Sequence, residues 1–360
     1  MNIEQLAETL GGVYRSYGYR PYSMSKFEEY ELYLRNKDFL ISDRVLTFTD
    51  TDGKLMALKP DVTLSIIKNT TDRADGIQKV YYRENVYRPG KSEQGFREIM
   101  QVGLECMGAV DSYCVLEVLL LAVKSLRAIS DSCVLDISHM GLLSRLLDKA
   151  GLTGASRTAV LEAISSKNAH EIRKICVEAG ASGQDLERIA KLGGSADAVM
   201  PQLEDIFADD PEFAMFRQLL DALRVAGADC VNVDFSVIND MNYYNGIVFR
   251  GFVEGVPAGV LSGGEYDGLM SRMKRRDKAI GFALYPDLLE RLCMPEQTGD
   301  DGAVLLYEVG TDPVVVATAV KDFVRQGIII SAQPETMCAR YSGKVYKLEG
   351  SEVKSLEIDA

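Results

Sequence analysis

Polar residues suited to binding a small charged molecule recur in short stretches of this sequence. In "LKPDVT", Asp61 and Thr63 stand at the mouth of an expected helix, which Asp61 is equally suited to cap. In "QVGLE", Gln101 and Glu105 are four residues apart on an expected strand, so they share one face of it. Arg88 ends "VYR" with a fork of donors that fits a carboxylate or a phosphate. A solvated arginine and a half-exposed strand with one polar face are the simpler alternatives.

Two later stretches combine tyrosines with glycines. "NDMNYYNGIVF" contains Tyr243 and Tyr244 just before an apolar run, and "LSGGEYDGL" contains Gly263, Gly264 and Tyr266. Glycines let the backbone approach a ligand or a neighbouring strand closely. The tyrosines could supply hydroxyl groups to a site, or they could be core aromatics whose hydroxyls find local partners.

The elements that must position these residues follow from hydrophobic periodicity and turn signals. Two long β-rich segments, 78–89 and 96–108, are joined by a polar loop and predict an antiparallel pair. The Asp52-Gly53 dipeptide predicts a hairpin, which a short helix over 61–68 follows. Periodicity also predicts helices near 3–17 and 112–128 and a strand at 133–138.

The pattern changes near Gly141. From there to about Gly227 the segments are amphipathic helices with glycine and serine breaks, which predicts a helical insertion over about 141–227. Strand patterns return between 229 and 264, and a short helix is expected over 287–292. After a linker rich in Pro, Gly and Asp, a small βαβ-like tail follows. We therefore predict a core over 1–295 and a C-terminal α/β domain over 296–360.

Composition narrows the function classes. The formal net charge of −13 gives no general attraction to nucleic acid, so it counts against tRNA binding. The sequence has no apolar run long enough for a membrane span, and its start does not resemble a signal peptide. Seven scattered cysteines and two histidines predict reduced thiols and no zinc or other metal site. These features place the chain in the cytoplasm.

The order of the motifs resembles the catalytic core of histidyl-tRNA synthetase over roughly residues 1–295. "YYNGIVF" and "SGGEYDGL" are similar to the two histidine-binding signatures of that family. The resemblance implies an α+β fold, in which the mostly antiparallel sheet of a class II aminoacyl-tRNA synthetase is flanked by helices and carries a helical insertion. It also implies a histidine-binding set: Asp61, Thr63, Arg88, Gln101, Glu105, Tyr243, Tyr244, Gly263, Gly264 and Tyr266.

The sequence departs from the synthetase pattern at positions that serve catalysis. Asn239 stands where the family has an arginine that stabilises charge on the reacting phosphate, and Gly90 replaces an acid that helps to hold ATP. Leu288 stands at the ATP-binding arginine of the third motif, although Arg291 lies one helical turn later. Asn242 replaces the aspartate of the tyrosine signature.

An amino-acid pocket without its catalytic groups, followed by a short acidic tail, resembles the ATP phosphoribosyltransferase regulatory subunit. Members of this family are catalytically inactive relatives of histidyl-tRNA synthetase. The resemblance implies no catalytic residues, no cofactor and no tRNA. It implies as partner the short-form catalytic subunit of ATP phosphoribosyltransferase, in a hetero-octamer built around regulatory-subunit dimers, with histidine as effector. An active histidyl-tRNA synthetase and a synthetase-like paralogue with another ligand or partner are the alternatives. Whether histidine occupies the old pocket or a subunit interface stays open.

Overall fold

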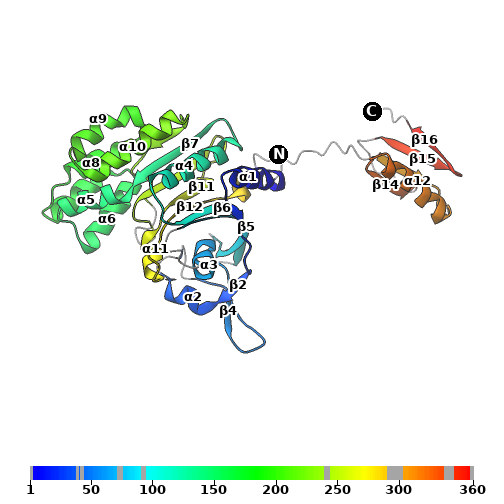
Figure 1. Cartoon of the computed structure of the whole chain (residues 1–360), viewed down its shortest axis with the longest axis horizontal. Coiled ribbons are helices and arrows are strands. Elements are labelled where there is room, and N and C mark those ends of the chain that lie inside the picture. The colour runs from blue at the N-terminus through cyan, green and yellow to red at the C-terminus, as the bar shows by residue number, and fades with distance from the viewer. Residues whose placement is uncertain are drawn as a thin grey trace. The chain divides into compact units, whose positions relative to one another are not determined.

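The computed structural model describes residues 3–37, 40, 44–70, 76–90, 95–238, 244–289, 303–335 and 344–356. The chain forms two compact units, one over Ile3–Leu292 and the other from Cys293 onward (Figure 1). None of the described helices is long and apolar enough to span a membrane.

A nine-stranded sheet forms the larger unit, in the order β1-β5-β6-β12-β11-β10-β7-β9-β8. Its neighbours pair antiparallel except at β1·β5 and β7·β9. The strands are β1 (Arg20–Pro21), β5 (Ile77–Pro89), β6 (Phe96–Gly108), β7 (Cys133–His139), β8 (Gly194–Ser195), β9 (Val231–Val233), β10 (Ile247–Val253), β11 (Leu261–Glu265) and β12 (Lys278–Leu284). The predicted long antiparallel pair is confirmed as β5 and β6.

Helices α1 (Ile3–Ser16) and α4 (Ser112–Arg127) cover one face of this sheet (Figure 1). The hydroxyl groups of Tyr14 and Ser125 are 2.8 Å apart where the two helices meet. The ring of Tyr14 also packs edge-on against Phe282 of β12. Because α4 is apolar nearly all round, it is buried between the sheet and the insertion, as its sequence predicted.

The opposite face carries α3 (Val62–Asn69), with a three-stranded sheet of β2 (Phe27–Glu29), β4 (Leu55–Leu58) and β3 (Thr47–Thr49) nearby. The predicted hairpin is confirmed, since β3 and β4 pair antiparallel and Gly53 adopts a φ of +79° in the turn. The short helices α2 (Tyr30–Arg35) and α11 (Asp267–Arg272) complete this side. Leu64, Ile66 and Ile67 bury α3 against the sheet.

The predicted helical insertion contains six helices between β7 and β9: α5 (Met140–Lys149), α6 (Gly154–Ser165), α7 (Ala169–Glu178), α8 (Gln184–Lys191), α9 (Ala196–Phe207) and α10 (Pro211–Val225). The two-residue strand β8 lies among them and was not expected. The described part of the helix expected over 287–292 is a 3₁₀ turn, η2 (Pro286–Leu289), whereas 290–292 lie outside the described residues.

The smaller unit contains a second sheet in the order β14-β13-β15-β16 and the helix α12 (Pro313–Arg325). Helix α12 connects β13 (Ala303–Tyr307) to β14 (Ile330–Pro334), and the two strands pair in parallel. The predicted βαβ tail is therefore confirmed. Two strands that the sequence did not predict, β15 (Val345–Glu349) and β16 (Glu352–Leu356), extend the sheet. The core of this unit is formed by Leu305, Ala319, Phe323 and Leu348.

Candidate functional site

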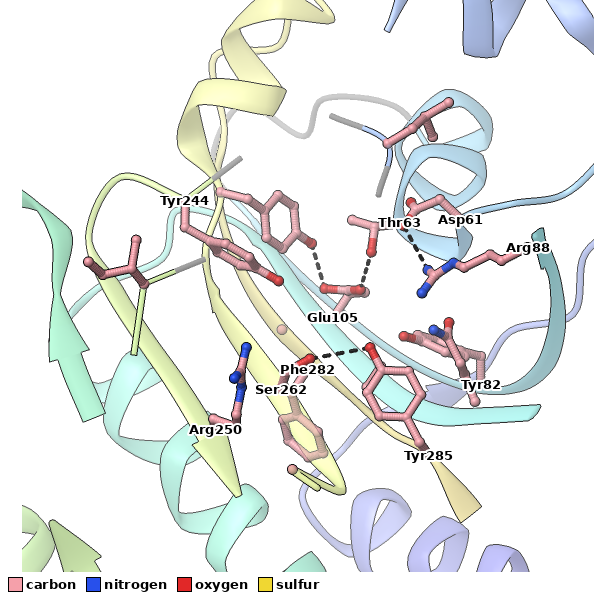
Figure 2. A pocket seen from close by; sticks show the side chains of 17 residues that line it. Asp61, Thr63, Tyr82, Arg88, Glu105, Tyr244, Arg250, Ser262, Phe282 and Tyr285 are labelled. Atoms are coloured by element: carbon pink, nitrogen blue, oxygen red, sulfur yellow. Dashed lines mark hydrogen bonds and ion pairs between the residues drawn. The ribbon is translucent and has the colours of Figure 1, made fainter. Parts of the chain in front are cut away.

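A cavity of about 590 Å³ lies on the face of the large sheet that also carries α3 (Figure 2). Strands β6, β12 and β11 form its floor, where Glu105 pairs with Gly281 and Gly281 pairs with Gly264. A second row on the same face lies two positions further along each strand. It consists of Gly103, Ala283, Ser262 and Arg250. The predicted residues that line the cavity are Asp61, Thr63, Arg88, Gln101, Glu105, Tyr244 and Tyr266.

Glu105 is the buried centre of this arrangement, with 2% of its surface exposed. Thr63 Oγ1 donates a hydrogen bond of 2.8 Å to one carboxyl oxygen (Figure 2). The Tyr266 hydroxyl donates one of 2.7 Å to the other. Burial raises the pKa of Glu105 to about 8, although these two hydrogen bonds favour the charged form. The carboxyl group is therefore mostly neutral at pH 7 until a ligand supplies a positive charge.

Glycine is required beneath Glu105. A Cβ atom at Gly281 would lie 1.7 Å from Glu105 Oε2 and 2.5 Å from the backbone oxygen of Leu104. Both clashes fall far below any normal contact distance, so Gly281 makes the space in which the carboxyl group lies.

Asp61 and Arg88 form the wall beside the first turn of α3. Asp61 caps this helix by accepting the N–H of Leu64 at 2.9 Å, and it also lines the cavity. The pocket and cap interpretations of Asp61 therefore hold together. Arg88 donates its Nε hydrogen to the Pro60 oxygen at 2.8 Å, with Nη2 3.8 Å from Asp61 Oδ2. Burial raises the pKa of Asp61, and the nearby guanidinium opposes that rise.

The simpler alternatives for β5 and β6 are wrong. The Arg88 side chain is only 13% exposed, and Gln101 and Glu105 are buried within β6. The half-exposed part of β6 is confined to its first residues, which lie at the open end of the long pair.

The two glycines of "SGGEYDGL" face opposite sides of β11. A Cβ atom at Gly264 would lie 2.5 Å from the ring of Tyr244, so this glycine lets the tyrosine ring approach the strand closely. Gly263 faces away from the cavity, where a Cβ atom would lie 2.6 Å from the Phe249 ring. Burial raises the pKa of Tyr244 well above its usual value.

Four residues named in the sequence analysis lie outside the described residues: Tyr243, Asn239, Asn242 and Arg291. Gly90 is described, and its N–H donates to the Gly95 oxygen at 3.1 Å as β5 ends.

Four polar residues that line the cavity were not predicted as site residues: Tyr82, Arg250, Ser262 and Tyr285. Only Arg250 carried a usable signal, because it is the one charged residue in the apolar strand "IVFRGFV". The others depend on register between distant strands, which the sequence does not reveal.

This arrangement can hold a small ligand that carries both charges. Asp61 and Glu105 can bind a cationic group, Arg88 can bind an anionic group, and the hydroxyl and amide groups can fix a polar ring. Among the described residues, no group of three or more His, Cys, Asp or Glu is suited to hold a metal ion.

Comparison with known proteins gives the family. The family model for histidyl-tRNA synthetase matches residues 1–289. An ATP phosphoribosyltransferase regulatory subunit from a Synechococcus species is 30% identical over 336 residues, which are 88% of this chain and 79% of the relative. The chain belongs to the histidyl-tRNA synthetase family, among its ATP phosphoribosyltransferase regulatory subunits. The resemblance inferred from the sequence motifs is confirmed.

Solved structures of this family share the fold. One is described as an ATP phosphoribosyltransferase regulatory subunit/histidyl-tRNA synthetase from Bacillus halodurans, and it aligns with a TM-score of 0.76 at 22% identity, covering 94% of this chain and 89% of that one. A chain from the ATP phosphoribosyl transferase (HisG:HisZ) complex of Thermotoga maritima aligns with a TM-score of 0.63 at 19% identity, covering 79% and 97%. The predicted class II synthetase-like α+β fold is therefore confirmed.

Proposed function

We propose that this chain is the regulatory subunit of a cytoplasmic ATP phosphoribosyltransferase and has no catalytic activity of its own. It is required for the activity of a short-form catalytic subunit and for feedback inhibition by histidine, at the first step of histidine biosynthesis. The subunits assemble as a hetero-octamer built around dimers of this chain. The proposal is carried by one observation: a chain of the regulatory-subunit family has a cavity lined by Asp61, Arg88 and Glu105.

Histidine fits the cavity by charge and hydrogen bonding. Its ammonium group would face Asp61 and Thr63, and its imidazole nitrogens would face Glu105 and Tyr244, which line the same cavity. Gln101 and Tyr266 complete the proposed effector site. Histidine that binds one state of the complex more tightly than the other shifts the balance between them, which is sufficient for feedback.

The deciding experiment mixes the purified chain with a short-form catalytic subunit and follows the formation of phosphoribosyl-ATP. We expect no product from this chain alone, faster product formation by the mixture, and inhibition of the mixture by histidine. An unchanged rate on mixing contradicts the proposal.

A second function has one observation in its favour, because the histidyl-tRNA synthetase family model covers residues 1–289. Histidine-dependent exchange of pyrophosphate into ATP tests it. The asparagine at 239 and the glycine at 90 remove a cation and an acid that this exchange uses in the family pattern, so we expect no exchange above background.

A further inference from the structure

Two buried polar side chains of the cavity lack a hydrogen-bond partner in the described part of the chain. Tyr82 of β5 is 2% exposed and Gln101 of β6 is 3% exposed, and both line the cavity. Among the residues that the structure describes, the Tyr82 hydroxyl and the Gln101 amide form no hydrogen bond with another residue. Buried polar groups are nearly always hydrogen-bonded, so a ligand in the cavity is the expected partner of both.

Strand register places the Tyr82 hydroxyl group in the middle of a polar row. Gln101, Gly103 and Glu105 alternate along β6, so they share the face that forms the cavity. Tyr82 pairs with Gly103, and a Cβ atom at Gly103 would lie 2.6 Å from the Tyr82 hydroxyl oxygen. The hydroxyl group therefore occupies the place of the missing side chain, between Gln101 and Glu105. Figure 2 shows it directed toward the interior of the cavity.

The network around Glu105 does not use this hydroxyl group. Glu105 accepts one hydrogen bond on each carboxyl oxygen, from Thr63 and from Tyr266. Tyr82 therefore takes no part in fixing the carboxyl group at the end of the row. A tyrosine hydroxyl group has one hydrogen to donate, and the hydrogen of Tyr82 remains for a ligand.

Arg88 lies at the Gln101 end of the row. It shares the cavity face of β5 with Tyr82, and it already donates its Nε hydrogen to the Pro60 oxygen at 2.8 Å. A guanidinium group is suited to a carboxylate, but a carboxylate has about four acceptor sites, so one partly engaged arginine does not satisfy it. The neutral donors of Tyr82 and Gln101 adjoin Arg88 and can fill the remaining sites.

We propose that Tyr82 is a further ligand-binding residue of the effector site, and that its hydroxyl group donates a hydrogen bond to the carboxylate of the bound amino acid. The inference deepens the proposed effector site and rests on the proposed function for the identity of the amino acid. Tyr82 then helps the site to distinguish an amino acid from the corresponding amine, which has no carboxylate. Because the hydroxyl group has no described partner in the protein, its removal weakens binding without lowering stability.

The test is Tyr82→Phe, which removes the hydroxyl group and keeps the ring. Urea unfolding measures the stability of the empty chain, and calorimetric titrations of the full chain use histidine, histamine and imidazolepropionate. Histamine lacks the carboxylate of histidine, and imidazolepropionate lacks its ammonium group. The matched control is Tyr14→Phe, because Tyr14 is fully buried on the opposite face of the same sheet, with its hydroxyl oxygen 2.8 Å from Ser125 Oγ.

Tyr82→Phe should weaken the binding of histidine and of imidazolepropionate by about tenfold to a hundredfold, which corresponds to one hydrogen bond to a charged group. Its affinity for histamine should stay within twofold of the wild type, and its urea midpoint should not change. Tyr14→Phe should show the opposite pattern, with a lower urea midpoint and unchanged titrations.

Four results overturn the proposal. Tyr82→Phe binds histidine within twofold of the wild type, it weakens histidine and histamine by the same factor, it lowers the urea midpoint as Tyr14→Phe does, or the wild-type chain binds no histidine. Activation of the catalytic subunit by the wild-type chain is measured on the same preparation. A mixture without faster product formation counts against the proposed function. An active, histidine-inhibited mixture with unchanged Tyr82→Phe titrations counts against this contact alone.

Discussion

At the scale of single residues, the cavity depends on groups that the fold keeps out of water. Glu105 is the clearest case, because two hydroxyl donors favour its charge and burial still outweighs them. Ionisation of a carboxyl group of this kind destabilises the empty protein. A cation that binds beside the group offsets this cost. The site is therefore prepared for a ligand rather than for stability.

This gives a prediction for the pH dependence of stability. The pKa of Glu105 is about 8 in the folded chain, against 4.5 as its ordinary value. Between these pH values the folded state keeps a proton that the unfolded state has released. The free energy of unfolding should therefore fall with rising pH by up to about 1.4 kcal/mol per unit from this group, and level off above pH 8. Glu105→Gln lacks this dependence.

Urea unfolding of the wild type and of Glu105→Gln at pH 5, 6, 7, 8 and 9, without ligand, measures the difference. Other buried acids titrate in both proteins, so the difference between the two curves isolates Glu105. We expect the free energy of unfolding of Glu105→Gln to rise relative to that of the wild type by a few kcal/mol across this pH range. Parallel curves would mean that Glu105 titrates normally.

A second residue-scale prediction concerns the glycine beneath Glu105. Gly281→Ala places a methyl group against a backbone oxygen and the buried carboxyl group, so we expect a loss of about 1–3 kcal/mol in the free energy of unfolding. Histidine binding should also be lost, because the carboxyl group must move. Denaturant unfolding and calorimetry measure the two effects.

The matched control is Gly12→Ala in the interior of α1. Its new Cβ atom would meet nothing closer than Arg15 Nη2 at 3.9 Å. Alanine favours a helix over glycine by about 0.5–1 kcal/mol, so this variant should be slightly more stable and should bind histidine normally. Equal losses in both variants would show that the space beneath Glu105 is not special.

Seven of the residues named from the sequence line the cavity, but the sequence did not show how they meet. Gln101 and Glu105 follow from spacing along one strand, and Asp61 and Thr63 follow from a helix start. That Thr63 and Tyr266 both bond Glu105 depends on register across β6, β12 and β11, which is fixed by the whole sheet. Arg250 was visible as a charge in an apolar strand, but no local pattern says which way it faces.

At the scale of elements, α3 is the piece that must be held in place, because its first turn carries Asp61 and Thr63. Lys59, just before this turn, is fully buried, and its Nζ lies 2.8 Å from Glu84 Oε2 on β5. Glu84 also accepts the N–H of Met24 at 3.2 Å. At the other end, Arg275 donates to the carbonyl oxygens of Ile67 and Thr70 where α3 ends.

The ion pair before α3 gives an element-scale prediction. Lys59→Met leaves the Glu84 charge largely buried without its cation, so we expect a loss of about 3–5 kcal/mol in the free energy of unfolding. Because α3 loses its anchor to β5, histidine binding should weaken as well. Denaturant unfolding and calorimetric titration report the two effects separately.

The double variant Lys59→Met/Glu84→Met removes both charges and serves as the control. Replacing a buried pair with apolar groups is often neutral or stabilising, so most of the lost stability should return. A double variant as unstable as Lys59→Met would show that packing around Lys59, rather than the unpaired charge, is responsible.

Elements were easier to predict than their ends. Long periodic segments such as Phe96–Gly108 and Ser112–Arg127 were predicted within one residue, since periodicity averages over many side chains. The turn after β12 was predicted as an α-helix and is a short 3₁₀ segment, because Pro286 and its neighbours give too few periodic positions to decide. Strands β8, β15 and β16 are short or exposed, so their pairing depends on partners rather than on their own patterns.

At the scale of the whole molecule, the chain has separate cores. The larger unit packs the sheet between helices, whereas the smaller unit packs α12 on its own four-stranded sheet. The sequence indicated this division through a linker rich in Pro, Gly and Asp. It could not say which surface of either unit meets a partner, since a docking surface has no periodic pattern of its own.

Separate cores predict separate unfolding. Phe323 is buried in the smaller unit, where its ring lies 4.7 Å from that of Tyr346, and Phe249 is buried in the larger unit against Phe282. Removing a buried phenylalanine ring costs about 3–5 kcal/mol. Phe323→Ala should therefore lower only the calorimetric transition of the smaller unit and leave histidine binding unchanged. Phe249→Ala should lower the other transition and weaken histidine binding, because Phe249 lies beneath the strands that form the cavity floor. If both variants shift one common transition, the two units unfold cooperatively and the separate cores do not make separate folding units.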